Sequence, residues 1–342
     1  MRAIVIRPPH ELRIEEREAD TPSHGQVSVR IGAGGICGSD LHYYQHGGFG
    51  TVRVQEPMIL GHEIAGRVEQ LGPDVTGLAV GDAVAINPSR PCGYCGYCLK
   101  GLPNHCLNLR FFGSAMPMPH IQGGFREHLV CDAGQCVRGG DTKLGLLALA
   151  EPFAVALHGV ARADALPGKR VLVCGSGPIG ALVVAACRHA GAAEVIATDV
   201  VDEPLVIVRK LGADRTINAA ADQAALAALA AGKGTVDVAF ECSGNEQALR
   251  AAMEALRPRG VLVQLGLGGD VSLLQNMVVA KELDLRGSFR FHSEFAEAAR
   301  LIADGRVDLS PLITETFDLA HAVAAFEAAG DRRRSMKVQL AF

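Results

Sequence analysis

The sequence predicts an α/β fold in which a β-rich domain, built from both ends of the chain, encloses an inserted domain with a doubly wound parallel sheet. The chain has 342 residues, which is enough for two domains of ordinary size. Up to about residue 150 it is rich in glycine and in short alternating strands. After Pro167-Gly168, short apolar strands alternate with helices, which implies right-handed crossovers and a parallel sheet.

The spacing of apolar residues gives the expected elements in chain order. In the first half, half-buried strands are expected at Gln26–Ile31, Ile64–Val68 and Val80–Ala85. In the second half, the expected strands are Arg170–Cys174, Glu194–Thr198, Val236–Phe240, Val261–Leu265 and one that begins at Asp284–Arg286. The expected helices are Pro178–Ala190, Pro204–Leu211, Gln223–Ala231, Gln247–Leu256, Phe295–Asp304 and Ala320–Ala329. No internal repeat interrupts this order.

The composition excludes several classes of protein. Hydrophobic residues make up 49% of the chain and charged residues 20%, as in a soluble globular protein rather than a disordered one. The formal net charge is −4, and Trp is absent, so the chain offers neither a polyanion-binding surface nor a stacking platform for bases. We interpret the short basic run Arg332-Arg333-Arg334 as a solvated surface, and we expect no nucleic-acid partner.

The location is expected to be cytoplasmic. The apolar start Met1–Ile6 is too short for a signal sequence, and the apolar stretch Ala148–Val160 carries Glu151 and His158, so no membrane partner is expected. Ten cysteines in such a chain favour metal binding over a disulfide framework.

A glycine-rich loop indicates a dinucleotide site. The string Gly175-Ser176-Gly177-Pro178-Ile179-Gly180 follows an expected strand and opens an expected helix, where a pyrophosphate can lie at the helix N-terminus. Asp199 follows the last glycine by about 20 residues, at the place of a ribose partner. An Asp there repels a 2′-phosphate, and no cation follows it before Arg209, so NAD is favoured over NADP. The alternative is a simple turn, with Asp199 capping a helix.

Four cysteines have the spacing of a structural zinc site. Cys92, Cys95, Cys98 and Cys106 form the pattern C-x-x-C-x-x-C followed by a fourth cysteine. Four thiolates complete the tetrahedron that zinc prefers and leave no open position, so this ion would brace its lobe, Asn87–Asn108, rather than take part in catalysis. The alternative is four free thiols in a loop.

A second, scattered group could hold a catalytic zinc, which keeps mixed ligands and an open position. Its candidates are Cys37, His62, Glu63 and Glu151. Taken singly, Cys37 could be a small buried residue, His62 a core histidine and Glu63 a solvated strand residue. Glu151 is harder to dismiss, because a carboxylate within an apolar run is costly unless it is paired or ligating. The sequence does not show whether these residues meet.

Together these motifs resemble the zinc-containing medium-chain dehydrogenase family, over essentially the whole chain. The string Gly61-His62-Glu63-x-x-Gly66, followed by Gly72 and Val75, resembles its zinc signature. The strings Cys37-Gly38-Ser39-Asp40-x-His42-Tyr43, Glu151-Pro152 and Gly287-x-Phe289-Arg290 resemble its sorbitol dehydrogenase branch. Longer strings resemble the L-idonate 5-dehydrogenases of that branch; they are Gly34–Gln45, Arg110–Met116, Gly287–Phe291 and the ending Lys337-Val338-Gln339-Leu340-x-Phe342.

The resemblance implies a GroES-like catalytic domain, residues 1–147 and 288–342, and a Rossmann NAD-binding domain, residues 148–287. It implies two zinc ions per subunit, with Cys37, His62 and a glutamate, either Glu63 or Glu151, on the catalytic one. It also places the cofactor against residues beyond the glycine loop, namely Leu265, Gly266, Leu267, Ser288, Phe289 and Arg290. The subunits are expected to form a homo-oligomer, a dimer or a tetramer.

The resemblance further implies how the substrate is handled. Tyr43, Glu151, Arg290 and Phe291 match positions that line the substrate pocket. Zinc would polarise a secondary hydroxyl, Ser39 would take its proton, His42 or Glu151 would pass it on, and hydride would move to NAD. The expected substrate is a sugar acid, L-idonate, which gives 5-keto-D-gluconate, and its carboxylate needs a cation. Arg290 is the first candidate but also occurs in polyol-using relatives, so Arg110 is the more informative candidate, with His292 third.

Three other functions stay open at this point. The nearest is the same chemistry on a neutral polyol such as sorbitol or xylitol. A non-catalytic protein that binds zinc and nucleotide is a second, although Cys37, His62, Glu63 and Glu151 are all present. A third is an enzyme with a cysteine nucleophile in the zinc lobe, against which the paired spacing argues.

Overall fold

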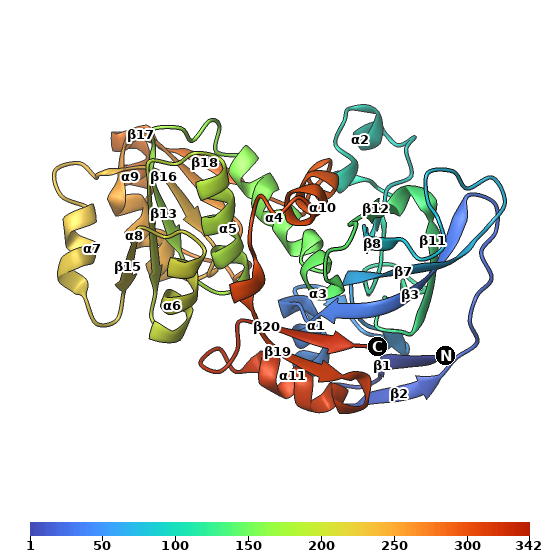
Figure 1. The fold of residues 1–342 in the computed structure, drawn as a ribbon. Helices are drawn as coiled ribbons and strands as arrows, with labels where there is room; N and C mark the ends of the chain where they lie inside the picture. Colours follow the sequence, from blue (N-terminus) through green and yellow to red (C-terminus); the bar gives the residue numbers. More distant parts are fainter.

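The inserted part of the chain forms a six-stranded parallel sheet in the order β15-β14-β13-β16-β17-β18. The computed structural model describes residues 1–342, and this sheet occupies one lobe of it (Figure 1). Its strands are β13 (Arg170–Cys174), β14 (Glu194–Asp199), β15 (Arg215–Asn218), β16 (Val236–Glu241), β17 (Leu256–Gln264) and β18 (Asp284–Gly287). The helices between them are α5 (Pro178–His189), α6 (Asp202–Lys210), α7 (Gln223–Leu229), α8 (Glu246–Ala255) and α9 (Gln275–Lys281).

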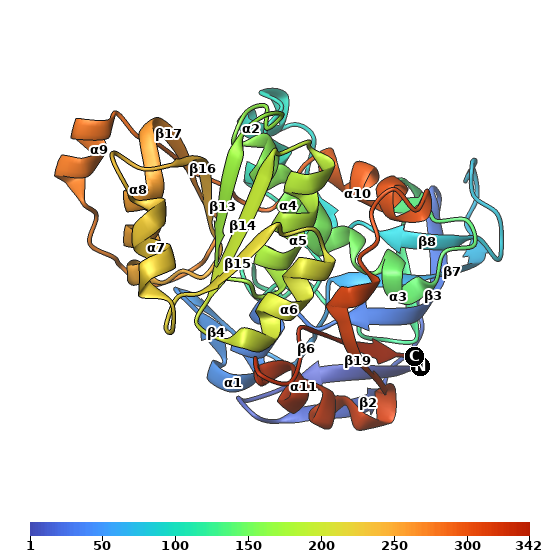
Figure 2. The same cartoon turned by 60° about the vertical axis from the view of Figure 1, so that its left-hand side comes forward.

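Successive residues of β13 face two separate cores, as the side-chain alternation of a strand requires. Val171 and Val173 pack in the core that contains α5, whereas Leu172 and Cys174 pack in the core that contains α7 and α8. A strand buried on both faces reads as a continuous apolar run, and this is why β13 and β14 were predictable within one residue. Figure 2 shows the helices on both faces of the sheet. The expected doubly wound sheet is present.

The β-rich lobe is a seven-stranded sheet that both ends of the chain build. Its order is β12-β8-β7-β3-β20-β19, and β11 pairs with β3. The strands are β3 (Gln26–Gly35), β7 (Glu63–Leu71), β8 (Ala83–Ile86), β11 (His128–Asp132), β12 (Cys136–Arg138), β19 (Ile313–Asp318) and β20 (Lys337–Ala341). Because β20 runs antiparallel to β3, with Gln339 opposite Gly35, the last residues of the chain reach the middle of the lobe.

The remaining elements of this lobe surround that sheet. A three-stranded sheet has the order β2-β1-β6, from β1 (Arg2–Ile6), β2 (Leu12–Glu16) and β6 (Met58–Ile59). Shorter pieces are β4 (Gly48–Phe49), β5 (Val52–Arg53), β9 (Ser89–Arg90) and β10 (Arg110–Phe111). The helices are α1 (Gly38–His46), α2 (Gly96–Leu99), α3 (Leu144–Leu147), α10 (Glu294–Ala303) and α11 (Ala322–Gly330).

Two sequence-based boundaries are wrong. Val80 was placed in a strand, but it is 64% exposed and lies in the turn before β8, where Gly81 has a φ of +96° and the Asp82 carboxylate accepts the amide of Ala79. The strand predicted from Val261 instead begins at Leu256, directly after α8. At the start of β17, Arg257, Pro258 and Arg259 are exposed, so no apolar run marks this part of the strand.

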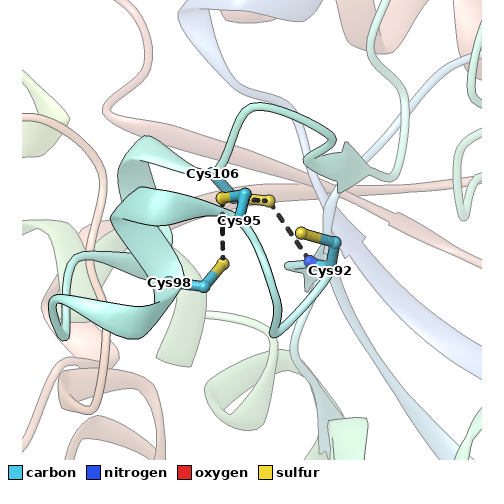
Figure 3. Close-up of side chains that lie close together, drawn as sticks. All are labelled: Cys92, Cys95, Cys98 and Cys106. Atoms are coloured by element: carbon cyan, nitrogen blue, oxygen red, sulfur yellow. Dashed lines mark hydrogen bonds between the residues drawn. The ribbon is translucent and has the colours of Figure 1, made fainter.

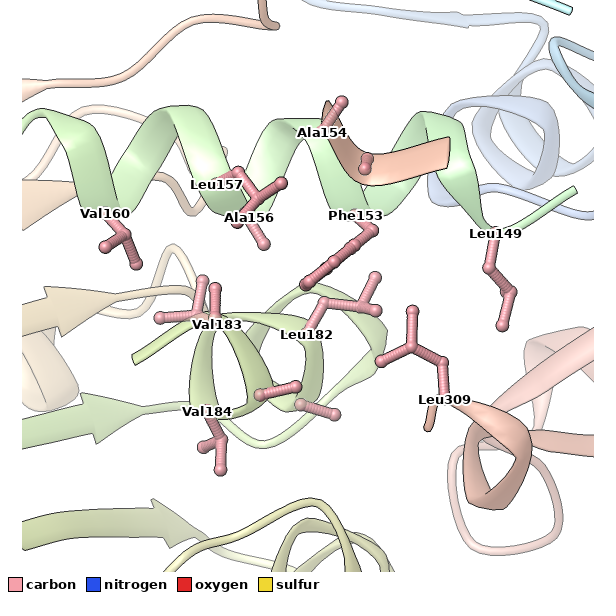
Figure 4. Packing of buried hydrophobic residues seen from close by; sticks show 14 of the residues in the cluster. Leu149, Phe153, Ala154, Ala156, Leu157, Val160, Leu182, Val183, Val184 and Leu309 are labelled. Atoms are coloured by element: carbon pink, nitrogen blue, oxygen red, sulfur yellow. The ribbon is translucent and has the colours of Figure 1, made fainter. Parts of the chain in front are cut away.

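Helix α4 (Ala150–Ala161) lies between the two lobes and is packed against α5. Figure 4 shows Phe153, Leu157 and Val160 of α4 facing Leu182 and Val183 of α5. The stretch Leu144–Ala161 is apolar and long enough to cross a membrane by composition alone, but 67% of it is buried inside the fold. Burial within the fold therefore explains the apolar character of this stretch, which contains α3 and α4.

Candidate active site

Three sequence-predicted ligands meet at the junction of β3, α1 and β7. Cys37 precedes α1, Glu63 is the first residue of β7, and His62 stands just before it. Their ligand atoms all lie within 4.8 Å of one another. A sulfur, an imidazole nitrogen and a carboxylate at this spacing form the donor set of a catalytic zinc with an open position. The residues present therefore fit the ion.

The carboxylate of Glu63 is paired with a buried lysine that the sequence did not reveal as a site residue. Lys337 Nζ donates to Glu63 Oε1 and Oε2, both at 2.8 Å, and to the carbonyl of Ile36 at 3.1 Å. Burial is the largest single effect and lowers the pKa of Lys337, but the charges of Glu63, Cys37 and Glu151 and the hydrogen bond to Glu63 together outweigh it and raise the pKa. Gly35 lies so close to Glu63 that a Cβ there would collide with the carboxylate. The ion pair of Lys337 and Glu63 is thus shielded from solvent.

Asp40 is a second residue to which the sequence assigned no role. It is fully buried; its Oδ2 accepts the amide of Cys37 at 3.0 Å and its Oδ1 accepts the amide of Gly61 at 3.2 Å. Oδ1 also lies 3.8 Å from His62 Nδ1. A carboxylate on the far side of a ligating histidine orients the ring and sets its tautomer. Asp40 therefore positions the loops that carry both Cys37 and His62.

Glu151 lies in the first turn of α4 and is 5% exposed, but it is not among the three residues that share the 4.8 Å group. Burial raises its pKa to about 8; His62 opposes the shift, and Glu63 and Cys37 add to it. Burial and the charge of Glu63 likewise raise the pKa of the Cys37 thiol to about 11. A bound cation stabilises the charged forms of Cys37 and Glu151 and so offsets the cost of ionising them in a buried site. The shifted pKa values therefore fit a site that binds a metal ion.

The four clustered cysteines form a second group well apart in sequence from the first. All four sulfurs lie within 4.8 Å of one another, with 3.6 Å between Cys95 and Cys98 and 3.9 Å between Cys95 and Cys106 (Figure 3). A zinc–sulfur distance of about 2.3 Å gives a tetrahedron with edges of roughly 3.8 Å. The amides of Cys92 and Asn108 donate to Cys106 Sγ at 3.2 and 3.3 Å, which suits a thiolate. This group also fits zinc, with all four positions taken.

The expected substrate-binding residues divide into two sets. Tyr43 is buried, and its hydroxyl accepts the amide of Ala115 at 3.2 Å. The guanidinium of Arg290 lies 4.2 Å from the ring centre of Phe111, which is itself 5.6 Å from His62. Burial lowers the pKa of Arg290, while Glu151 and Tyr43 oppose the shift, so all three lie close together. Ser39 and the exposed His42 lie three residues apart on α1, hence on one face.

Arg110, Phe291 and His292 lie elsewhere. Arg110 precedes Phe111 on β10, and because neighbouring strand residues point to opposite faces it turns away from His62 into an outer hollow with Arg90 and Asp132. Phe291 is 2% exposed and packs on Phe295 in the core. His292 is exposed. The expected contacts of Arg110 and Phe291 with the substrate are therefore not supported by their positions.

The glycine-rich loop has the form that a pyrophosphate requires. Gly175 has a φ of +86°, and a Cβ on Gly180 would collide with the carbonyl of Gly175, which brings helix α5 close to β13. Gly177 is the N-cap of α5 and faces open space, and Pro178 and Ile179 form the first turn. The Asp199 carboxylate accepts the amide of Ser176 at 2.8 Å.

The second expected cofactor segment lies across the end of the sheet. Leu265, Gly266 and the exposed Leu267 follow β17, and Ser288 follows β18. Ser288 Oγ is buried without a hydrogen-bond partner, which is costly and fits a missing polar ligand. The carbonyl of Phe289 accepts from Asn104 of the cysteine lobe at 3.0 Å, so that lobe supports this loop. The residues present fit a dinucleotide.

A β-rich lobe with a mixed-ligand metal group, facing a dinucleotide-binding sheet, defines the class of zinc-dependent dehydrogenases. The comparisons agree. The alcohol dehydrogenase GroES-like domain matches residues 23–141, and the zinc-binding dehydrogenase domain matches residues 178–304. The chain belongs to this family of zinc-binding alcohol dehydrogenases. The predicted fold class and family, and the expected zinc-dependent, nicotinamide-using dehydrogenase, are confirmed.

Individual relatives narrow the comparison. The chain is 42% identical to L-idonate 5-dehydrogenase (NAD(P)(+)) of Escherichia coli K12, over 96% of this chain and 95% of that protein. It is 34% identical to sorbitol dehydrogenase of Bacillus subtilis, over 96% and 93%. The crystal structure of L-idonate 5-dehydrogenase from E. coli superposes with a TM-score of 0.96 at 40% identity, covering 100% of this chain and 98% of that one.

Proposed function

We propose that this dehydrogenase oxidises the C5 hydroxyl of L-idonate to give 5-keto-D-gluconate, with NAD as the hydride acceptor. Arg290 offers a cation for the carboxylate of a sugar acid, although the string Gly287-x-Phe289-Arg290 also matches the sorbitol dehydrogenase branch. Its guanidinium contacts the sulfur of Met116 and lies over the rings of Phe111 and Phe289 rather than against an acidic side chain. Arg290 is partly buried and forms no salt bridge, although the charge of Glu151 acts on it, so its guanidinium donors are available to the carboxylate of a substrate. The 42% identity to an L-idonate 5-dehydrogenase supports the same choice.

The domain roles follow from the two sheets. Residues 1–147 and 288–342 are proposed as the GroES-like catalytic domain, because β20 closes the sheet that β3 and β7 begin. Residues 148–287 are proposed as the Rossmann domain. Zinc held by Cys37, His62 and Glu63 would supply Lewis-acid polarisation of the substrate hydroxyl. NAD bound at the glycine loop would supply the oxidising power.

Proton removal falls to the chain's own side chains. Ser39 and His42 share one face of α1, and the exposed His42 can exchange a proton with water. Glu151, buried in the first turn of α4, offers a second route for the proton. Tyr43, whose hydroxyl accepts the amide of Ala115, is proposed to orient the substrate. Asp40 and Lys337 keep His62 and Glu63 in place during this transfer.

The setting of the enzyme is part of the proposal. All ten cysteines are free thiols, which suits the reducing cytoplasm. A homo-oligomer, dimer or tetramer, is expected from the family. The second candidate substrate is a neutral polyol, favoured by the 34% identity to a sorbitol dehydrogenase.

One assay separates the two candidates. Reduction of NAD is measured with L-idonate, D-sorbitol, xylitol and L-threonine, for the wild type and for Arg290→Met. We expect L-idonate to be preferred, and Arg290→Met to raise its KM by roughly 10- to 100-fold, the scale of a charge-assisted hydrogen bond. Arg110→Met, which removes an arginine from the outer hollow, is the matched control and should change KM little. A wild type active on sorbitol but on no aldonate would reject the sugar-acid substrate.

A further inference from the structure

The turn between α11 and β20 brings an arginine to the carboxylate at the end of β14. Arg332 Nη2 lies 3.3 Å from Asp199 Oδ2 and 3.4 Å from Oδ1. The Asp199 side chain is 2% exposed and that of Arg332 is 61% exposed. The guanidinium therefore covers the carboxylate on one side and faces solvent on the other. This position differs from the solvated surface expected for the arginine run.

Asp199 does not need Arg332 to stay in place. Its Oδ2 accepts the amide of Ser176 at 2.8 Å, and its Oδ1 accepts the amides of Val200 and Val201 at 2.8 and 3.1 Å. Three backbone donors fix the carboxylate and satisfy most of its lone pairs. The arginine therefore changes the charge at this end of β14 rather than its geometry.

The residues that follow β14 supply no cation of their own. Val200 and Val201 are apolar, and Asp202 and Glu203 open α6 with two more negative charges. A 2′-phosphate carries close to two negative charges at neutral pH, as phosphate monoesters do. On the local sequence alone, Asp199 would repel it. Arg332, which lies far away in sequence, supplies a positive charge that offsets that of Asp199.

Of the three consecutive arginines, the structure directs one to this place. Arg334 makes two hydrogen bonds of 2.9 Å to the carboxylate of Glu315. The turn itself is closed by Asp331, whose carbonyl accepts the amides of Arg334 and Ser335 and whose carboxylate accepts the amide of Arg333. The turn is held by its own bonds, so the Arg332 side chain is free to contact a ligand.

Resting on the proposed use of a nicotinamide dinucleotide, we propose that Arg332 is a cofactor-specificity residue that binds the 2′-phosphate of NADP and lets this site accept NADP beside NAD. A guanidinium has five donors in a planar fork that matches phosphate. With NAD, Arg332 stays on Asp199 and the carboxylate meets the ribose. With NADP, its exposed donors turn to the phosphate and offset the charge of Asp199.

Fluorescence titration of NADH and NADPH tests this without any alcohol substrate, so failure of the proposed sugar-acid oxidation would leave the result standing. Arg332→Gln should raise the Kd of NADPH by roughly 10- to 100-fold, while the Kd of NADH changes less than about threefold. Arg333→Gln removes a neighbouring charge that has no place in the site, and should leave both values within about threefold.

A second background separates phosphate binding from a structural role. If Arg332 contacts the phosphate, Arg332→Gln should still raise the Kd of NADPH about tenfold or more in an Asp199→Ser protein. If it serves only to pair with Asp199, that effect vanishes in the Asp199→Ser protein. Three outcomes would each overturn the proposal. The first is this loss of effect in the Asp199→Ser protein, and the second is an equal rise in the Kd of NADH and NADPH in Arg332→Gln. The third is a wild type that binds NADH but not NADPH.

Discussion

Replacing Lys337 with Met should destabilise the protein most when the neighbouring metal group carries no zinc. The side chains of Lys337 and Glu63 are 3% and 1% exposed, and two bonds of 2.8 Å join them. Methionine keeps the length of the side chain but removes the charge, which leaves a buried carboxylate without a partner. Breaking a buried ion pair in this way costs about 3–5 kcal/mol.

A bound zinc ion would change that figure. Because Glu63 lies within 4.8 Å of Cys37 and His62, the ion can replace the lost counter-charge. We therefore expect the zinc-loaded Lys337→Met protein to lose about 1–2 kcal/mol, well below the loss in zinc-free protein. At roughly 2–4 °C per kcal/mol, the zinc-free variant should melt on the order of 10 °C lower than zinc-free wild type. Thermal unfolding before and after treatment with a chelator measures the difference.

The controls for this experiment lie in the same chain. Lys281 also donates three hydrogen bonds, to the carbonyls of Met253, Glu254 and Leu256, but it lies far from either metal group. Lys281→Met should cost the same with and without zinc. In Glu63→Gln protein the further change Lys337→Met should be neutral or stabilising, because it removes the buried charge that Glu63→Gln leaves unpaired. A zinc-free Lys337→Met protein as stable as wild type would refute the reasoning.

Three further outcomes follow from the two metal groups and from one ion pair. Cys37→Ser should abolish NAD reduction and lower the zinc content by about one ion per subunit, with the fold retained by circular dichroism. Cys95→Ser should instead lower the Tm and the solubility, because that ion organises its own lobe. Burial raises the pKa of Glu294, but the hydrogen bond with His158 and those from backbone amides outweigh it and lower the pKa to about 2. The charged Glu294 therefore stabilises the fold at pH values above the ordinary pKa of a carboxyl group. Glu294→Gln should therefore cost about 1–3 kcal/mol at pH 7 in denaturant unfolding, a difference that shrinks as the pH falls through 4.5 towards 2.

The fold was largely predictable because its signals are local. The glycines that bring α5 close to β13 stand in one short string, and strands buried on both faces read as apolar runs. The cysteine tetrad was predictable for the same reason, since its members lie within one lobe. The scattered metal group was harder. Cys37, His62 and Glu63 could be named as candidates, but the sequence did not show whether they meet, and the structure supplied the distances that bring them together.

The sequence did not reveal the contacts that join distant segments. Arg110 and Phe111 are adjacent, yet strand alternation places Phe111 towards His62 and Arg110 away from it, and this register cannot be read from the sequence. The sequence around Lys337 does not show that this lysine is buried. Its place beside Glu63 follows only from the pairing of β20 with β3. Arg332 looked like surface charge because its partner Asp199 lies in the other sheet. Each of these depends on sheet pairing over a long sequence separation.

The last twelve residues of the chain connect the two halves of the proposed chemistry. Arg332 stands against Asp199 of the nucleotide sheet, and Lys337, five residues on, stands against Glu63 of the metal group. Both carboxylates are almost fully buried. A cation beside each therefore changes the electrostatic potential there far more than a charge at the exposed surface could. A shift of β20 relative to β3 would therefore disturb the metal group and the cofactor site together. The sheet resists such a shift, because β20 is paired on both sides, with β3 and with β19.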